Sequence, residues 1–177
     1  MKKIFVLLLI VSAVLMSCGG DIDTSNVKTG YIIDAPHGHY AFGTAVVVMS
    51  GDTIISATLD EFQFQGASDD LIGVPNSFVE GADNYFGKGF AEGQVLVSKK
   101  TDSAAYSANM AAHGGATVPI ADNYAAIEAF VVGKTIAEIE GVASQEAEKV
   151  TDAVSGATLA DTKGYLGMII KAAKAAK

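Results

Sequence analysis

The fold is decided by residues 43–59, which read GTAVVVMSGDTIISATL. Two runs of β-branched and apolar residues flank Ser50-Gly51-Asp52, a group of residues typical of tight turns, so the stretch predicts a β-hairpin. Side chains alternate between the two faces of a strand. Strict alternation in the second strand predicts two sets of residues, namely Ile55, Ala57 and Leu59 on one face and Ile54, Ser56 and Thr58 on the other.

The residues after this hairpin indicate further strands separated by loops. Phe62 and Phe64 alternate with glutamines and extend the second strand, and Gln94–Ser98 predicts another short strand. Residues 66–94 are rich in glycine and aromatic residues, which predicts loops rather than a long element. Loops of this length in a compact domain often line a ligand site.

Helices are expected in the second half of the chain. The periodic apolar residues of 119–132 follow a proline and precede Gly133, which is typical of a helix and its end. Residues 135–138 have the pattern of a capping box, which predicts a short helix ending near Gly141. A last helix is expected from Asp161, as N-cap, to the lysine-rich end. The sequence thus predicts one α+β domain, a curved antiparallel sheet packed against a few helices.

Composition excludes several classes of function. The chain has 177 residues, a net charge of -8 and 12 basic residues that are all lysine, so it has no surface suited to the phosphates of nucleic acid. Its single cysteine excludes an internal disulfide and a cysteine-rich metal site. Three histidines, His37, His39 and His113, are too few for a metal site, and we expect none.

The N-terminal segment predicts export from the cytoplasm. Two lysines, the apolar run 4–11 and small residues up to Cys18 have the layout of a signal peptide, 1–17, that is removed from the mature protein. Residues 15–18 resemble a bacterial lipobox, which makes Cys18 the lipidated first residue of the mature chain. Residues 18–29 then form a lipidated, flexible tether to a domain over 30–177. The alternative is an ordinary secretory signal with a free cysteine.

The segment with the clearest chemistry is 150–159, which reads VTDAVSGATL and precedes the predicted last helix. Its small residues allow a ligand to approach the backbone closely. The first turn of a helix also presents unpaired N–H groups at the positive end of its dipole. These features predict an anion site, with phosphate as the usual occupant.

The stretch D-A-V-S-G-A-T (152–158) resembles the signature of the covalent FMN-binding domain family, which includes the flavin-bearing subunits of the Na+-pumping NADH:quinone oxidoreductase and of the Rnf complex. The resemblance extends to residues 31–59 and 106–135. It implies that FMN is attached to Thr158 through a phosphoester bond, made by a flavin transferase with FAD as donor. The remaining residues that the resemblance assigns to the cofactor site are Ser155, Gly156 and Ala157, which form the turn, and Asp152, which opens the motif.

This sequence departs from some members of the family after Thr158. Those members continue with threonine-serine and have a glycine five residues on, whereas here Leu159-Ala160-Asp161-Thr162 intervenes and Gly164 follows. The departure concerns the start of the last helix.

The resemblance implies a lipid-anchored electron carrier outside the cytoplasm, at the cell surface or in a periplasm. It would carry electrons between a membrane oxidoreductase and an external redox acceptor, without substrate turnover of its own. We further expect Tyr85, Phe86, Phe90 and Met110 either to pack against the flavin ring or to belong to the core. The alternative function is a lipoprotein that binds a ligand or docks a partner without covalent flavin.

Overall fold

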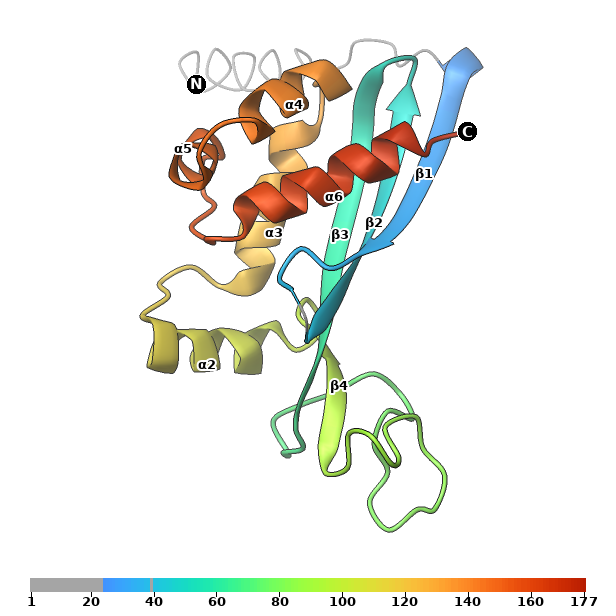
Figure 1. Ribbon diagram of the computed structural model, residues 1–177, viewed down its shortest axis with the longest axis vertical. Helices are drawn as coiled ribbons and strands as arrows, with labels where there is room; N and C mark the ends of the chain where they lie inside the picture. The colour runs from blue at the N-terminus through green and yellow to red at the C-terminus, as the bar shows by residue number, and fades with distance from the viewer. Residues whose placement is uncertain (1–23, 39) are drawn as a thin grey trace, which may run out of the picture.

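The computed structural model describes residues 24–38 and 40–177 (Figure 1). The predicted signal segment 1–17, Cys18 and His39 lie outside the described residues. Within the described residues, a four-stranded antiparallel sheet packs against five α-helices, which confirms the predicted α+β fold as a single domain. None of these helices is long and apolar enough to cross a membrane.

The sheet is a meander in which each strand pairs with the next one along the chain. Its strands are β1 (Val27–Asp34), β2 (Ala41–Ser50), β3 (Thr53–Gly66) and β4 (Gln94–Ser98). A short 3-10 turn, η1 (Thr24–Asn26), precedes β1. The sheet therefore includes residues 27–29, which the sequence had assigned to the tether.

The predicted hairpin is confirmed as β2 and β3, but the predicted faces of β3 are wrong at its start. The register of the pair shifts between Val48 and Met49, and the shift leaves Ile55 as the extra residue of a β-bulge. Ile54 consequently faces the helices together with Leu59, and both side chains are buried. Strict alternation fails here because one inserted residue reverses the direction of every side chain on one side of it.

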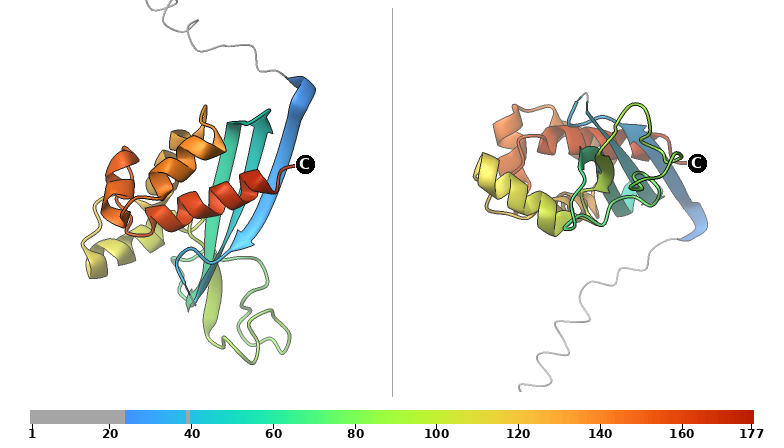
Figure 2. Two further views of the ribbon diagram at one scale, coloured as in Figure 1. Left: turned by 45° about the horizontal axis from the view of Figure 1, so that its top comes forward. Right: turned by 90° about the horizontal axis from the view of Figure 1, so that it is seen from below.

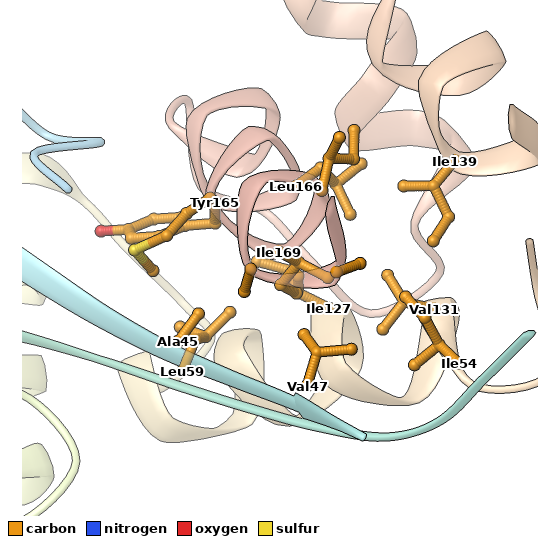
Figure 3. Close-up of a cluster of buried hydrophobic side chains, with 14 of the residues drawn as sticks. Ala45, Val47, Ile54, Leu59, Ile127, Val131, Ile139, Tyr165, Leu166 and Ile169 are labelled. Atoms are coloured by element: carbon orange, nitrogen blue, oxygen red, sulfur yellow. The ribbon is translucent and has the colours of Figure 1, made fainter. Parts of the chain in front are cut away.

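The core lies between the sheet and the helices. Helix α6 (Thr162–Lys174) crosses β1 and β2, and α3 (Ile120–Val131) packs against β3 (Figures 1 and 2). Figure 3 shows side chains from the sheet pointing toward the apolar sides of these helices. The labelled members of the cluster are Ala45, Val47, Ile54, Leu59, Ile127, Val131, Ile139, Tyr165, Leu166 and Ile169.

Helix α6 approaches β1 very closely at Gly30. A Cβ atom at this position would lie 1.8 Å from the backbone oxygen of Ala172, so only glycine fits. After α6, the chain reaches β1 again, where the backbone groups of Thr29 and Lys177 exchange two hydrogen bonds of 3.4 Å.

The predicted helix at 119–132 and the capping box at 135–138 are confirmed. Helix α3 follows Pro119 and ends before Gly133, whose φ is 81°. In α4 (Ile136–Ala143), Thr135 and Glu138 make both bonds of the capping box. The connection between these helices is held on the sheet, because the Ile54 N–H donates to the Lys134 carbonyl at 2.9 Å.

Two helices and a long loop complete the fold. The helices α2 (Ser103–Gly114) and α5 (Ala147–Ala153) were not predicted, because α2 has no buried residue and α5 has only one, so neither shows an apolar stripe in the sequence. Residues 67–93 contain neither helix nor strand, as expected, and extend beyond one end of the sheet (Figures 1 and 2).

Candidate functional site

The predicted cofactor residues lie at the junction of α5 and α6. Asp152 belongs to the last turn of α5, and the others lie in the loop of residues 154–161 that joins the two helices. The exposed members of this group are Asp152, Ser155, Gly156 and Thr158, whereas Ala157 is buried. The motif thus presents a mostly solvent-facing surface on an anchored loop.

The 154–161 loop is anchored by two apolar side chains and a tight turn. Val154 and Ala157 belong to the core, and the Ala157 N–H donates to the Val154 carbonyl at 3.0 Å. Between them, Gly156 has a φ of 93°, and a Cβ there would come within 3.3 Å of the Ala126 Cβ on α3. Both its backbone conformation and its closeness to α3 therefore favour glycine at this position.

Thr158 is held by a single buried side chain from α3. The Oδ1 atom of Asn123 accepts a hydrogen bond from the Thr158 N–H at 2.6 Å and another from the Thr158 hydroxyl at 3.2 Å. Asn123 is 0% exposed, and its Nδ2 atom donates to the carbonyl oxygens of Val118 and Pro119. Every hydrogen-bonding group of this amide is used.

The start of α6 differs from the predicted anion site. Asp161 occupies the N-cap position, as expected, but its side chain does not cap the helix and instead contacts His37 Nδ1 at 2.8 Å. The Thr162 hydroxyl bonds back to the Leu159 carbonyl at 2.7 Å. Because the Thr158 N–H is satisfied by Asn123 and a carboxylate stands at the helix start, the α6 N-terminus is less suited to phosphate than the sequence indicated.

A buried polar cluster lies between β3 and the helices. Glu61 and Lys99 form an ion pair whose side chains are 0% and 1% exposed. The Tyr165 hydroxyl donates to Glu61 Oε2 at 2.8 Å, and the Tyr124 hydroxyl donates to the Tyr165 hydroxyl at 3.2 Å. The Lys99 Nζ atom also lies 4.7 Å from the centre of the Tyr106 ring. The second carboxylate oxygen of Glu61, Oε1, is buried without a hydrogen-bond partner.

Burial sets the ionisation of the two tyrosines in this cluster. Desolvation is the main cause that raises the pKa of Tyr124 and of Tyr165 well above the ordinary value of 10.0, and the nearby charge of Glu61 raises both further. Both hydroxyls therefore stay protonated in the folded protein and act as hydrogen-bond donors.

The aromatic residues proposed as flavin contacts pack against other aromatic side chains of β3 and of the loop 67–93. The ring centres of Phe86 and Phe90 lie 6.0 and 5.5 Å from the ring centre of Phe64. The Phe64 side chain points away from the helices, because side chains alternate along β3 and those of Glu61 and Gln63 point toward the helices. Tyr85 and Met110 are confirmed in the alternative role: Tyr85 is buried against Phe78, and Met110 packs on the core. Phe86 and Phe90 are exposed, and their contact with the flavin stays a prediction.

Two grooves open at the end of the sheet where β3 ends. One, of about 770 Å³, lies between the end of β3 and α2 and is lined by amides and alanines, including Gln63, Gln65, Ala105 and Asn109. The other, of about 650 Å³, lies on the face of the sheet that carries Phe42, Phe62 and Phe64. Neither of these grooves is lined by residues of the 154–161 loop.

The described histidines are accounted for by local contacts and positions. His37 contacts Asp161, and His113 lies in the last turn of α2. Within residues 24–38 and 40–177, no three histidine, cysteine, aspartate or glutamate side chains gather as metal ligands do.

Sequence reasoning missed the polar residues that organise the interior. Glu61 interrupts a strand at a position where a charged residue ordinarily marks a solvent-facing side, and Asn123 is an unremarkable residue in the first turn of a helix. The one signal for Asn123 was its place four residues after Pro119, in the first turn of the helix, from which its side chain can reach back to the Val118 and Pro119 carbonyls. No family model, no curated protein and no solved structure matches this chain.

Proposed function

We propose that the protein is a lipid-anchored flavoprotein electron carrier outside the cytoplasm, with FMN attached to Thr158 through a phosphoester bond. The resemblance of residues 152–158 to the FMN-attachment motif suggests the cofactor. The observation that carries the proposal is the state of Thr158 itself: its side chain is exposed on a loop that core contacts and Asn123 hold in place.

The residues just before Thr158 leave room for an attached phosphoryl group. Ser155 and Gly156 are exposed and small, so the side chains before Thr158 leave room for a bulky adduct and for the transferase that makes it. The chemistry needs a hydroxyl that a transferase can approach, and the exposed Thr158 supplies one. The attachment replaces the bond between the two phosphates of FAD, so AMP is the second product.

When bound, FMN supplies one-electron and two-electron transfer. The chain then has to hold the group at a fixed place, and the 154–161 loop and α3 do so. A membrane oxidoreductase is the proposed donor and an external redox partner the acceptor. Lipidation of Cys18 keeps the carrier at the membrane, where the donor is found.

Coproduction with a flavin transferase tests the proposal. The full chain, its Thr158→Ala variant and the control Thr117→Ala, which alters another exposed threonine in a loop, are separated under denaturing conditions and examined for flavin fluorescence. Cleavage after lysine releases residues 150–163 as one peptide, and fragmentation of this peptide locates the adduct. We expect the wild-type protein and Thr117→Ala to be yellow and fluorescent, with the mass of FMN less one water on Thr158, and Thr158→Ala to be colourless.

Other outcomes would redirect the proposal. An adduct on Ser155 or Thr151 would move the attachment residue within the motif. A colourless and unmodified wild-type protein would overturn the electron-carrier function and favour a lipoprotein that binds a ligand or a partner, for which the groove between β3 and α2 is the first place to search.

A further inference from the structure

We propose that Asn123 positions the Thr158 hydroxyl for flavin attachment; this inference rests on the proposed attachment at Thr158. Asn123 lies in the first turn of α3 and is fully buried, whereas Thr158 is exposed. Thr158 therefore lies at the surface, and the residue that orients its hydroxyl lies inside the protein. A transferase can approach Thr158 from the solvent side.

The orientation of the Asn123 amide follows from its hydrogen bonds. Its Nδ2 atom lies 3.1 Å from the carbonyl oxygen of Val118 and 3.0 Å from that of Pro119. Only the nitrogen end of an amide can donate to two carbonyl oxygens, so Oδ1 must face Thr158. These two bonds fix the side chain before any transferase arrives.

The contact with Oδ1 determines which way the Thr158 hydroxyl points. An amide oxygen only accepts hydrogen bonds, so the Thr158 hydroxyl donates its hydrogen to Oδ1 and keeps its lone pairs for attack on phosphorus. The shorter bond from the Thr158 N–H to the same oxygen holds the backbone at 2.6 Å. One atom thus fixes both the loop and the direction of the nucleophile.

The transfer balances without a proton acceptor on this chain. The bond between Thr158 Oγ1 and the phosphorus of the FMN half of FAD forms, and the phosphorus–oxygen bond to the AMP half breaks. AMP leaves with the bonding electron pair, and the hydroxyl proton is released from its hydrogen bond with Asn123 Oδ1 and passes to a base of the transferase. Asn123 takes no proton, because an amide oxygen is a weak base; it keeps the hydroxyl in a reactive orientation, which is a positioning role.

Steady-state kinetics of flavin incorporation test this role. Full-length chain prepared without flavin serves as the varied substrate for purified transferase at saturating FAD, with Asn123→Ala compared to the wild type and to Asn84→Ala, an exposed loop asparagine. We expect Asn123→Ala to lower kcat at least about tenfold while KM for the protein changes less than about threefold, because orientation is lost but the motif remains. Asn84→Ala is expected to behave as the wild type.

A change in KM alone, or a kcat equal to or above that of the wild type, would overturn the positioning role. Absence of incorporation into the wild-type protein would overturn the proposed function and this inference together. Incorporation into the wild type that Asn123→Ala does not slow would overturn the inference alone.

A second measurement on the wild-type protein avoids dependence on the stability of the variant. If Asn123 holds Thr158 as described, the Thr158 amide exchanges with solvent at least about tenfold more slowly than the same amide in an isolated peptide of residues 150–163, although its side chain is exposed. Equal exchange rates would show that the contact does not persist in solution and would reject the inference.

Discussion

Glu61 is the residue whose removal most directly disturbs the interior. Its carboxylate faces the Lys99 ammonium and accepts from the Tyr165 hydroxyl, and none of these side chains is more than 1% exposed. A buried charge is tolerated only while its partner is present, because the desolvation of each ion is otherwise uncompensated. The energetic role of this pair therefore depends on both members being kept or both being replaced.

We expect Glu61→Ala to lower the free energy of unfolding by about 3–5 kcal/mol, since it leaves Lys99 buried and unpaired. Replacing both charges, in Glu61→Leu with Lys99→Met, should restore most of this loss. Urea unfolding followed by circular dichroism measures both changes. Glu92→Ala, which removes one partner of the exposed pair with Lys88, is the matched control and should cost no more than about 1 kcal/mol. A Glu61→Ala loss as small as that of the control would contradict the importance of this pair.

Individual residues were predictable from the sequence where their role is periodic and not where it depends on a distant partner. The repeat of Ile120, Tyr124, Ile127 and Val131 identified the buried side of α3, and all four are buried. The partners of Asn123 and Glu61 lie 35 and 38 positions away in the chain, at Thr158 and Lys99. No local pattern specifies contacts of this kind, so they could be found only from the structure.

At the scale of elements, the contact of α6 with β1 depends on the absence of a side chain at Gly30. The obstacle to any larger residue is the backbone oxygen of Ala172, which cannot rotate out of the way as a side chain can. A larger residue at position 30 would therefore force α6 and β1 apart along the whole length of their contact.

Gly30→Ala is therefore expected to destabilise the protein by about 3 kcal/mol, at the upper end of the usual cost of overpacking. The control is Gly141→Ala in α4, where a new Cβ meets nothing within 4 Å and the better helix propensity of alanine should add about 0.5–1 kcal/mol. Thermal unfolding of the two variants beside the wild type gives the comparison. Equal melting temperatures for Gly30→Ala and the wild type would mean that α6 does not pack on β1 as described.

Elements were predicted from the sequence to the extent that they carry their own signals. Turn residues marked the β2–β3 hairpin, and the capping box marked α4. The bulge at Ile55 was missed because it arises from how two strands pair, not from the composition of either one. The alanine-rich α2 has good intrinsic helix propensity but no fully buried residue, so a method based on apolar periodicity passes over it.

At the scale of the whole molecule, the two faces of the sheet differ in character. The helices and the 154–161 loop occupy one face, and the other carries exposed apolar side chains, among them Tyr31, Ile33 and Phe42. The stability of the fold as a whole depends on the helix-covered face, where Tyr124 and Tyr165 are buried with their hydroxyls protonated.

These tyrosines make global stability decrease in alkaline solution. Because burial raises both pKa values above the ordinary 10.0, the unfolded chain loses these protons before the folded one does, and the unfolded state binds fewer protons above pH 10. The stabilising contribution is complete below pH 10 and is lost as the pH rises beyond it, by about 1.4 kcal/mol per pH unit for each tyrosine.

Urea unfolding between pH 9 and pH 11.5 tests this dependence in the wild type and in Tyr124→Phe. At neutral pH the variant should be less stable by about 1 kcal/mol, because it lacks the hydrogen bond to Tyr165. Above pH 10 its free energy of unfolding should fall less steeply than that of the wild type, because one fewer tyrosine releases a proton on unfolding. Parallel curves for the two proteins above pH 10 would show that Tyr124 ionises equally in the folded and unfolded states.

If FMN is attached to Thr158 as proposed, the anchor of Thr158 has a consequence for the use of this sequence as a flavin-attachment tag. Thr158 lies in the loop before α6, but the oxygen that holds it belongs to Asn123 on α3. A graft of residues 152–158 alone would carry Thr158, the proposed acceptor, into a foreign protein without that oxygen. A self-sufficient tag taken from this protein has to contain both the first turn of α3 and the loop, and so extends from Val118 to Thr162.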